Sequence, residues 1–165
     1  MAQFPMTKQE AKYHLSMAGE FFVAAELQRR GFSAAVTYGN AKRADVVAFS
    51  RSGDKAIVIE VKTTSNPKWI VGARLPDANA SPARPKPWVF VYIPLDPKGS
   101  PSYYIILQSK LREALTPEDT RYRKQYKETH GEEYGDRAGV VGFLKSDADK
   151  YENKWETITS LLEDM

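Results

Sequence analysis

The sequence predicts an α/β domain in which a mixed β-sheet is flanked by helices. Three observations support this class. A helical pattern opens the chain, short apolar segments typical of strands follow it, and further helical patterns close it. The chain has 165 residues, with no internal repeat and no low-complexity segment, so a single domain spanning residues 1–165 is expected.

The opening helix is expected to begin after Thr7 and to end at Gly31. Thr7 and Glu10 have the spacing of a capping box, in which two side chains satisfy backbone N–H groups at the start of a helix. Apolar residues then recur at helical spacing from Leu15 to Leu27. Gly31 is the residue type that most often follows the end of a helix.

Strand-like segments follow in two groups, separated by proline. Five segments have this composition: 33–38, 44–49, 56–62, 88–93 and 103–107. Turn residues at 52–54 predict an antiparallel hairpin between the second and third of them. Residues 68–73 fit either a fourth strand or an irregular segment. Four prolines at 76–87 predict a surface loop.

The last third of the chain is expected to be mainly helical. Ser109 is expected to cap a short helix that ends at Leu115, and Thr116 to begin another, with Pro117 at its first position. Residues 129–142 are rich in glycine and charge, which predicts a loop. A final amphipathic helix carries the apolar residues Trp155, Ile158, Leu161 and Leu162.

The composition excludes several kinds of site. The chain has no cysteine, which excludes disulfides, thiol catalysis, iron–sulfur clusters and thiolate zinc sites. Its two histidines, His14 and His130, are too few for a histidine-based metal site. Early charged residues argue against a signal peptide, and the longest apolar stretch, 88–95, is too short to span a membrane. A cytoplasmic protein with no membrane association is expected.

Positive charge is concentrated in the first two thirds of the chain. The net charge is +7 over residues 1–110 and −4 over residues 111–165, within an overall +3. This bias favours a polyanionic partner such as nucleic acid. Taken alone, it fits an uneven solvated surface better.

The residues that point to chemistry lie around the predicted hairpin. Side chains alternate between the two faces of a strand, so Glu60 and Lys62 share one face and Val61 points to the other. The hairpin can place Asp45 beside Glu60, and the opening helix can add Glu20. Three carboxylates and an ammonium would then meet at one end of the sheet.

Carboxylate oxygens and water form the hard-oxygen environment that Mg²⁺ prefers. Asp45, Glu60 and the carbonyl of Val61 are the expected ligands, and Glu20 is expected to bind the metal or a metal-bound water. Such a cation polarises a phosphodiester and lowers the pKa of a bound water. Lys62 can orient that water or stabilise the charge that develops on phosphorus. The alternative is a solvated hairpin end with a surface Glu–Lys pair, which contributes little to stability.

Basic and hydroxyl side chains near this segment are candidates for phosphate contact. They are Lys42, Arg43, Thr63, Thr64 and Lys68. The two threonines either bind phosphate oxygens or simply end the strand. Lys42 and Arg43 lie in the loop that leads to the sheet end, where phosphate contact is expected. Lys68 and Lys86 can line a nucleic-acid groove, although solvated loop positions are favoured for both. Trp69 can stack on a base, but packing in the core is favoured.

The arrangement of Asp45 and a later Glu60-x-Lys62, with a hairpin between them, resembles the motif of the PD-(D/E)xK nuclease superfamily. The helix is similar to that of the restriction-endonuclease-like and archaeal Holliday-junction-resolvase-like branches, in the pattern Gly19-Glu20-x-x-Val23-Ala24-x-x-Leu27 followed by Arg30-Gly31-Phe32. The likeness covers residues 16–64. Ala44 departs from it, because the motif has proline there.

The resemblance implies a restriction-endonuclease-like core and Mg²⁺-dependent cleavage of DNA by an endonuclease or exonuclease, with Mn²⁺ able to substitute. It implies catalytic roles for Glu20, Asp45, Glu60 and Lys62. A homodimer is expected where both strands are cut, and a partner protein can supply targeting. The alternatives are a non-catalytic nucleic-acid-binding module on the same fold and a protein-interaction module in which the charged cluster is structural.

Overall fold

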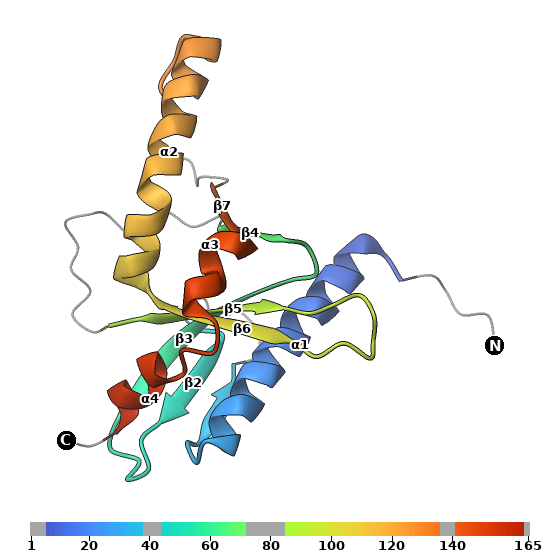
Figure 1. The fold of residues 1–165 in the computed structure, drawn as a ribbon, viewed down its shortest axis with the longest axis vertical. Helices are drawn as coiled ribbons and strands as arrows, with labels where there is room; N and C mark the ends of the chain where they lie inside the picture. Colours follow the sequence, from blue (N-terminus) through green and yellow to red (C-terminus); the bar gives the residue numbers. More distant parts are fainter. Residues whose placement is uncertain (1–5, 38–43, 72–84, 136–140, 164–165) are drawn as a thin grey trace.

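The computed structural model describes residues 6–37, 44–71, 85–135 and 141–163. It confirms the α/β class, with a mixed five-stranded sheet flanked by helices (Figure 1). In chain order the elements are α1 (Lys8–Arg29), β1 (Ala34–Val36), β2 (Val46–Phe49), β3 (Ala56–Thr64), β4 (Lys68–Val71), β5 (Pro87–Tyr92), β6 (Ser102–Leu107), α2 (Gln108–His130), β7 (Val141–Leu144), α3 (Lys145–Ala148), a 3₁₀ turn (Asp149–Tyr151) and α4 (Glu156–Leu162).

The main sheet has the strand order β1-β2-β3-β5-β6. Strands β3 and β5 run parallel, and the other neighbouring pairs are antiparallel. The parallel register places Glu60 beside Trp88 and Val61 beside Val89. The start of β5 therefore lies next to the Glu-x-Lys segment of β3. Strands β4 and β7 form a separate two-stranded antiparallel sheet.

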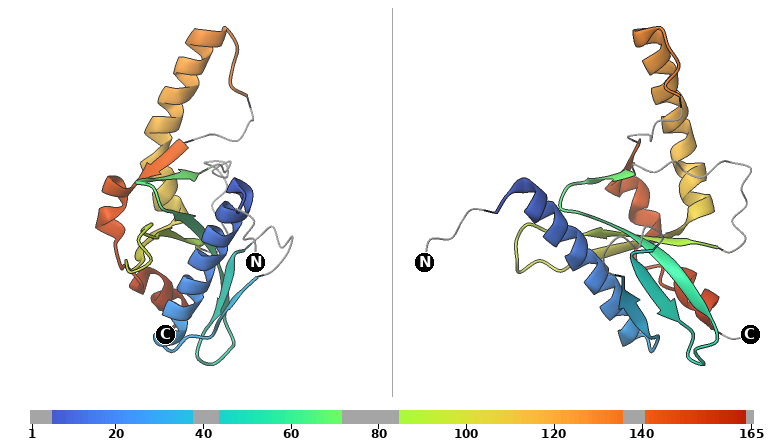
Figure 2. Two further views of the ribbon diagram at one scale, coloured as in Figure 1. Left: turned by 90° about the vertical axis from the view of Figure 1, so that its right-hand side faces the viewer. Right: turned by 180° about the vertical axis from the view of Figure 1, so that it is seen from behind.

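Each face of the main sheet buries its own apolar cluster. Alternation along β3 and β5 turns Ile59, Val61 and Val89 to the face that packs against α1 and α4. It turns Trp88 and Phe90 to the opposite face, where they meet α2 and the β4–β7 sheet. Figure 2 shows α1 running along the main sheet while α2 extends away from it.

The signals at the two ends of α1 are confirmed. Thr7 and Glu10 form the predicted capping box, and both of its hydrogen bonds to backbone N–H groups are present. Arg30 is the C-cap residue of α1. Gly31 follows it with φ of 82°, a conformation that favours glycine.

The prediction of two helices between residues 109 and 129 is wrong, because one helix spans Gln108–His130 with Pro117 inside it. A proline normally weakens a helix interior because it lacks an N–H donor. Here the first half is anchored by the buried side chains of Leu111 and Leu115. The second half is exposed and is supported by ion pairs one turn apart, such as Asp119 with Arg123.

The loop predicted at 129–142 is too long at both ends, since α2 continues to His130 and β7 begins at Val141. This strand pairs with β4, in a register that places Trp69 beside Phe143. Residues 68–71 therefore belong to a strand, one of the two structures expected for them. The final helix is shorter than predicted: Trp155 lies at its N-cap, and only Glu156–Leu162 is helical. None of the helices in the described part of the chain is long and apolar enough to cross a membrane.

Candidate active site

The hairpin of β2 and β3 brings Asp45 against the backbone of β3. Asp45 lies immediately before β2, and its Oδ2 accepts a 2.7 Å hydrogen bond from the N–H of Val61. Its own N–H donates to the carbonyl of Ile59 at 3.1 Å. Asp45 is thus attached at two points to the strand that carries Glu60 and Lys62.

Glu60 is held between two lysines. Lys62 Nζ donates to Glu60 Oε1 at 2.7 Å, and Lys86 Nζ donates to Oε2 at 2.9 Å. The two ammonium groups lie 5.5 and 5.9 Å from the centre of the Trp88 ring, respectively. Burial raises the pKa of the Glu60 carboxyl, but the hydrogen bonds from both lysines outweigh it and lower the pKa below its ordinary value. Glu60 is therefore ionised at neutral pH.

Glu20 approaches this group from α1. It is buried, with only 8% of its surface exposed. Burial and the negative charge of Asp45 raise the pKa of Glu20 to about 6, and Ser16 provides a weak 3.5 Å hydrogen bond that opposes the shift. The helix comes close because Gly19 lies directly against Thr63 of β3, where a larger side chain would overlap the threonine.

The three carboxylates repel one another. Burial raises the pKa of Asp45, the hydrogen bond from Val61 opposes this, and the charge of Glu60 raises it further. The charges of both Asp45 and Glu60 raise the pKa of Glu20. A cation placed among these groups would relieve that repulsion, and Lys62 and Lys86 relieve it only in part.

The donor set fits Mg²⁺ in its chemistry, because carboxylate and carbonyl oxygens are the ligands this cation prefers. Within the described residues, however, no group of three or more histidine, aspartate or glutamate side chains is close enough to hold a metal ion. Both oxygens of Glu60 are engaged by lysines, and one oxygen of Asp45 is engaged by Val61. For Glu60 to bind a metal ion, one of its carboxylate oxygens would therefore have to contact the metal in addition to its lysine, or in place of it.

The two threonines after Lys62 differ in their contacts. Thr63 Oγ1 is buried and has no hydrogen-bond partner among the described residues. Thr64 Oγ1 accepts from the N–H of Asn66 at 3.1 Å and lies 3.4 Å from the carbonyl of Lys68, which stabilises the turn into β4. The contacts of Thr64 fit a residue that ends the strand, whereas Thr63 lies against Gly19 of α1.

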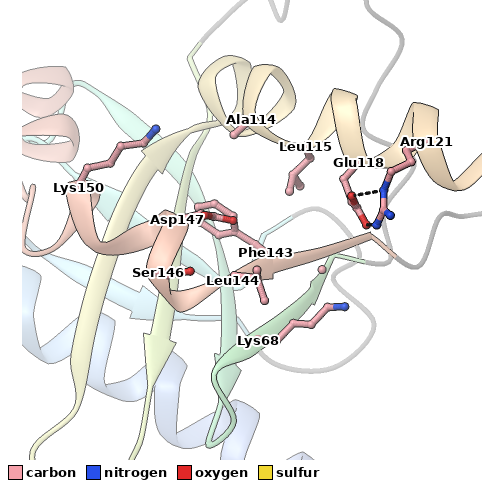
Figure 3. A pocket seen from close by; sticks show the side chains of 11 residues that line it. Lys68, Ala114, Leu115, Glu118, Arg121, Phe143, Leu144, Ser146, Asp147 and Lys150 are labelled. Carbon is pink, nitrogen blue, oxygen red and sulfur yellow. Dashed lines mark hydrogen bonds and ion pairs between the residues drawn. The ribbon is translucent and has the colours of Figure 1, made fainter.

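Lys68 belongs to a different part of the surface. It lines a pocket of about 650 Å³ between α2, β7 and α3, to which none of the carboxylate residues above contributes. Figure 3 shows Lys68 on β4, with Glu118 and Arg121 of α2 paired to each other elsewhere along the pocket wall. Lys42 and Arg43 lie outside the described residues.

Two further residues are placed clearly by the structure. Trp69 is packed as favoured: it is 1% exposed, and its indole N–H donates to the carbonyl of Val91 at 3.0 Å. Lys86 is not in a solvated loop, as the sequence favours, but at Glu60. In the sequence, the one feature that could have pointed to Lys86 is its place immediately before β5. That place predicts a contact with Glu60 only if β5 is known to pair with β3.

Comparison with protein-family models finds no match to this chain, and comparison with curated proteins finds none either.

Proposed function

We propose that this protein is a metal-dependent nuclease that hydrolyses phosphodiester bonds of DNA. The observation that carries the proposal is the attachment of Asp45 to the backbone of Val61, directly between Glu60 and Lys62 in sequence. It joins the two separated parts of the sequence motif at one end of the sheet. Glu20 adds a third carboxylate within electrostatic reach.

Asp45, Glu60, Glu20 and the carbonyl of Val61 would hold Mg²⁺, or Mn²⁺ in its place. When bound, the cation would neutralise the carboxylates, polarise the phosphodiester and lower the pKa of a water ligand.

The residues of the chain have separate tasks in this proposal. Asp45 offers a carboxylate whose orientation is set by the strand backbone. Glu60 holds the ammonium of Lys62, which would orient the attacking water and stabilise negative charge that develops on the phosphate. Glu20 is ionised above a pKa of about 6, so that at neutral pH it contributes negative charge to the site.

The arrangement of helices and strands supports a restriction-endonuclease-like core as part of this proposal. Segment 16–64, which carries the resemblance, includes most of α1 and the β2–β3 hairpin. Its last strand, β3, pairs in parallel with β5 and so belongs to a mixed sheet. A homodimer is part of the proposal where both strands of a duplex are cut, since each site hydrolyses one bond. A partner protein that directs the nuclease to its target is also compatible with it.

A second candidate function is a nucleic-acid-binding or protein-interaction module without catalysis. The observation that favours it is the complete engagement of Glu60 by Lys62 and Lys86. In that case the charged cluster stabilises the end of the sheet, and no divalent cation is required.

A cleavage assay separates the two functions. The substrates are supercoiled, linear, single-stranded and four-way-junction DNA together with RNA, each incubated with Mg²⁺, Mn²⁺ or EDTA. The variants Asp45→Asn and Lys62→Met are compared with Lys110→Met, a matched change at an exposed lysine paired with Glu113 on α2. Metal-dependent products that disappear in the first two variants alone support the nuclease, and conversion of supercoiled circles identifies an endonuclease. Absence of products from every substrate would contradict it.

A further inference from the structure

We propose that Lys86 binds a phosphate of the nucleic-acid backbone, and that Glu60 holds its ammonium group in place for this contact. The inference rests on the proposed function and adds to it a second, substrate-binding cation beside Lys62. It concerns a residue outside the Asp45 and Glu60-x-Lys62 motif.

The charges around Glu60 do not pair one to one. Glu60 carries one negative charge and has two ammonium partners, Lys62 at 2.7 Å and Lys86 at 2.9 Å. One carboxylate neutralises only one of them. Among the described residues, Asp45 is a second carboxylate within electrostatic reach of Lys86. If these two carboxylates are occupied as metal ligands, Lys86 is left with a charge that an anion must balance, and the proposed substrate is a polyanion.

Both lysines and Glu60 are partly accessible to solvent. The side chains of Lys62 and Lys86 are 33% and 25% exposed, and that of Glu60 is 21% exposed. The ion pair between Lys86 and Glu60 is thus neither fully buried nor fully solvated. A phosphate arriving at this surface can meet the Lys86 ammonium without any change in the strands.

The two lysines reach Glu60 from different parts of the backbone. Lys62 lies on the same strand and the same face as Glu60, two residues away, so that the pleat of β3 keeps the two side chains together. Lys86 reaches Glu60 from the residue before β5, and its carbonyl accepts a 2.9 Å hydrogen bond from the N–H of Gln108 at the start of α2. This bond anchors the backbone of Lys86, and an ammonium has three N–H donors, so Lys86 can keep its contact with Glu60 and also donate to a phosphate.

Trp88 limits where the ammonium can go. Its ring is buried beside Glu60 in the sheet and lies about equally far from the Lys62 and Lys86 nitrogens, at 5.5 and 5.9 Å. Both ammonium groups therefore lie over the face of the indole, and 25% of the Lys86 side chain remains exposed. This favours a contact with an external anion over a second internal one.

The experiment measures DNA binding in EDTA, where cleavage does not interfere, and again with Ca²⁺. A fluorescent duplex is titrated at several salt concentrations with the unmodified protein, Lys86→Met, Lys86→Arg and the control Lys110→Met. The slope of log K against log salt is negative, and loss of one phosphate contact makes it less steep by about 0.9 for a duplex. With Ca²⁺ occupying the carboxylates, we expect this decrease in steepness, and an approximately tenfold weaker affinity, for Lys86→Met. In EDTA, where Glu60 still pairs with Lys86, both effects should be smaller. Lys86→Arg and Lys110→Met should keep the slope of the unmodified protein.

The outcomes distinguish this inference from the proposed function. An unchanged slope and affinity in Lys86→Met, with or without a lower melting temperature, would show that Lys86 is only a structural partner of Glu60. Failure of the unmodified protein to bind DNA would overturn both proposals. Binding that depends on Lys86 without any metal-dependent cleavage would retain this inference and contradict the nuclease.

Discussion

The carboxylate of Asp45 accepts a 2.7 Å hydrogen bond from the backbone N–H of Val61, the residue between Glu60 and Lys62. A backbone donor has no rotamer freedom, so the position of Asp45 relative to the other two residues is set by the strand itself. A site assembled in this way tolerates little movement of the hairpin. The role of the Asp45 charge can be tested by a substitution that removes the charge but keeps an oxygen to accept from Val61.

Asp45→Asn is expected to abolish metal binding while leaving the fold intact. Asparagine retains an oxygen that can accept from Val61, but it removes the negative charge. In the unmodified protein, Mg²⁺ at 100 times its Kd should stabilise the folded state by about 2.7 kcal/mol. That corresponds to a rise in melting temperature of roughly 5–10 °C for a domain of this size. Thermal melts followed by circular dichroism, with a magnesium titration, measure the shift, and an equal shift in Asp45→Asn would contradict the assigned ligand.

Glu20→Gln is expected to stabilise the protein at high pH while it eliminates cleavage. Burial and the charge of Asp45 raise the pKa of Glu20 from 4.5 to about 6, so the folded state binds the proton more tightly than the unfolded state. Ionised Glu20 therefore costs stability above pH 6, and this cost disappears as the pH falls from 6 toward 4.5. The gain from glutamine should approach roughly 2 kcal/mol at pH 8 and vanish near pH 4. Urea unfolding across this range measures it.

Glu26→Gln on the same helix is the matched control, and its effect should have the opposite sign. Burial raises the pKa of Glu26, but hydrogen bonds from Arg30 and Arg29 outweigh it and lower the pKa. Its ionised form stabilises the folded protein above the unfolded-state pKa, and glutamine should lose that contribution at pH 8. The same sign for both variants would contradict the assigned environment of Glu20.

Gly19→Ala is expected to destabilise the protein and to displace Glu20. An added Cβ would overlap Thr63 Oγ1 and lie 2.9 Å from both other side-chain carbons of that residue. Overpacking of this kind costs about 1–3 kcal/mol, although alanine favours a helix over glycine by up to about 1 kcal/mol. Urea unfolding measures the loss. The double variant Gly19→Ala with Thr63→Ala should recover part of it, and no recovery would show that the two residues do not contact each other as described.

The sequence predicts those parts of the fold whose signals are local. The capping box of Thr7 and Glu10 fixes the start of α1, and the turn residues at 52–54 predict the hairpin that aligns Asp45 with β3. The alternation of β3 gives the correct faces, because Ile59 and Val61 are buried and Val58 is exposed. Each of these features depends on residues close together in the chain.

The features that the sequence does not reveal depend on distant partners. Strand β7 is four residues long and is stabilised by pairing with β4, about 70 residues earlier in the chain. Helix α2 continues through Pro117 because contacts beyond that position support it, such as the packing of Tyr122 and Tyr126 against Tyr134. Lys86 reaches Glu60 only because β5 lies parallel to β3, and no local pattern encodes that pairing.

Trp69→Phe is expected to lower stability without weakening DNA binding. Trp69 is almost fully buried against Phe90 and Tyr104, and its N–H donates to the carbonyl of Val91 at 3.0 Å, so it joins the β4–β7 sheet to the main sheet. Phenylalanine leaves that carbonyl without this donor, at a cost of about 1–3 kcal/mol. If Trp69 stacked on a base, removal of the whole ring would cost about 1–3 kcal/mol of binding free energy, and phenylalanine, which keeps a smaller ring, would lose part of it. Urea unfolding and DNA titration of the same variant decide between these roles, because weaker binding with unchanged stability would contradict the packing role.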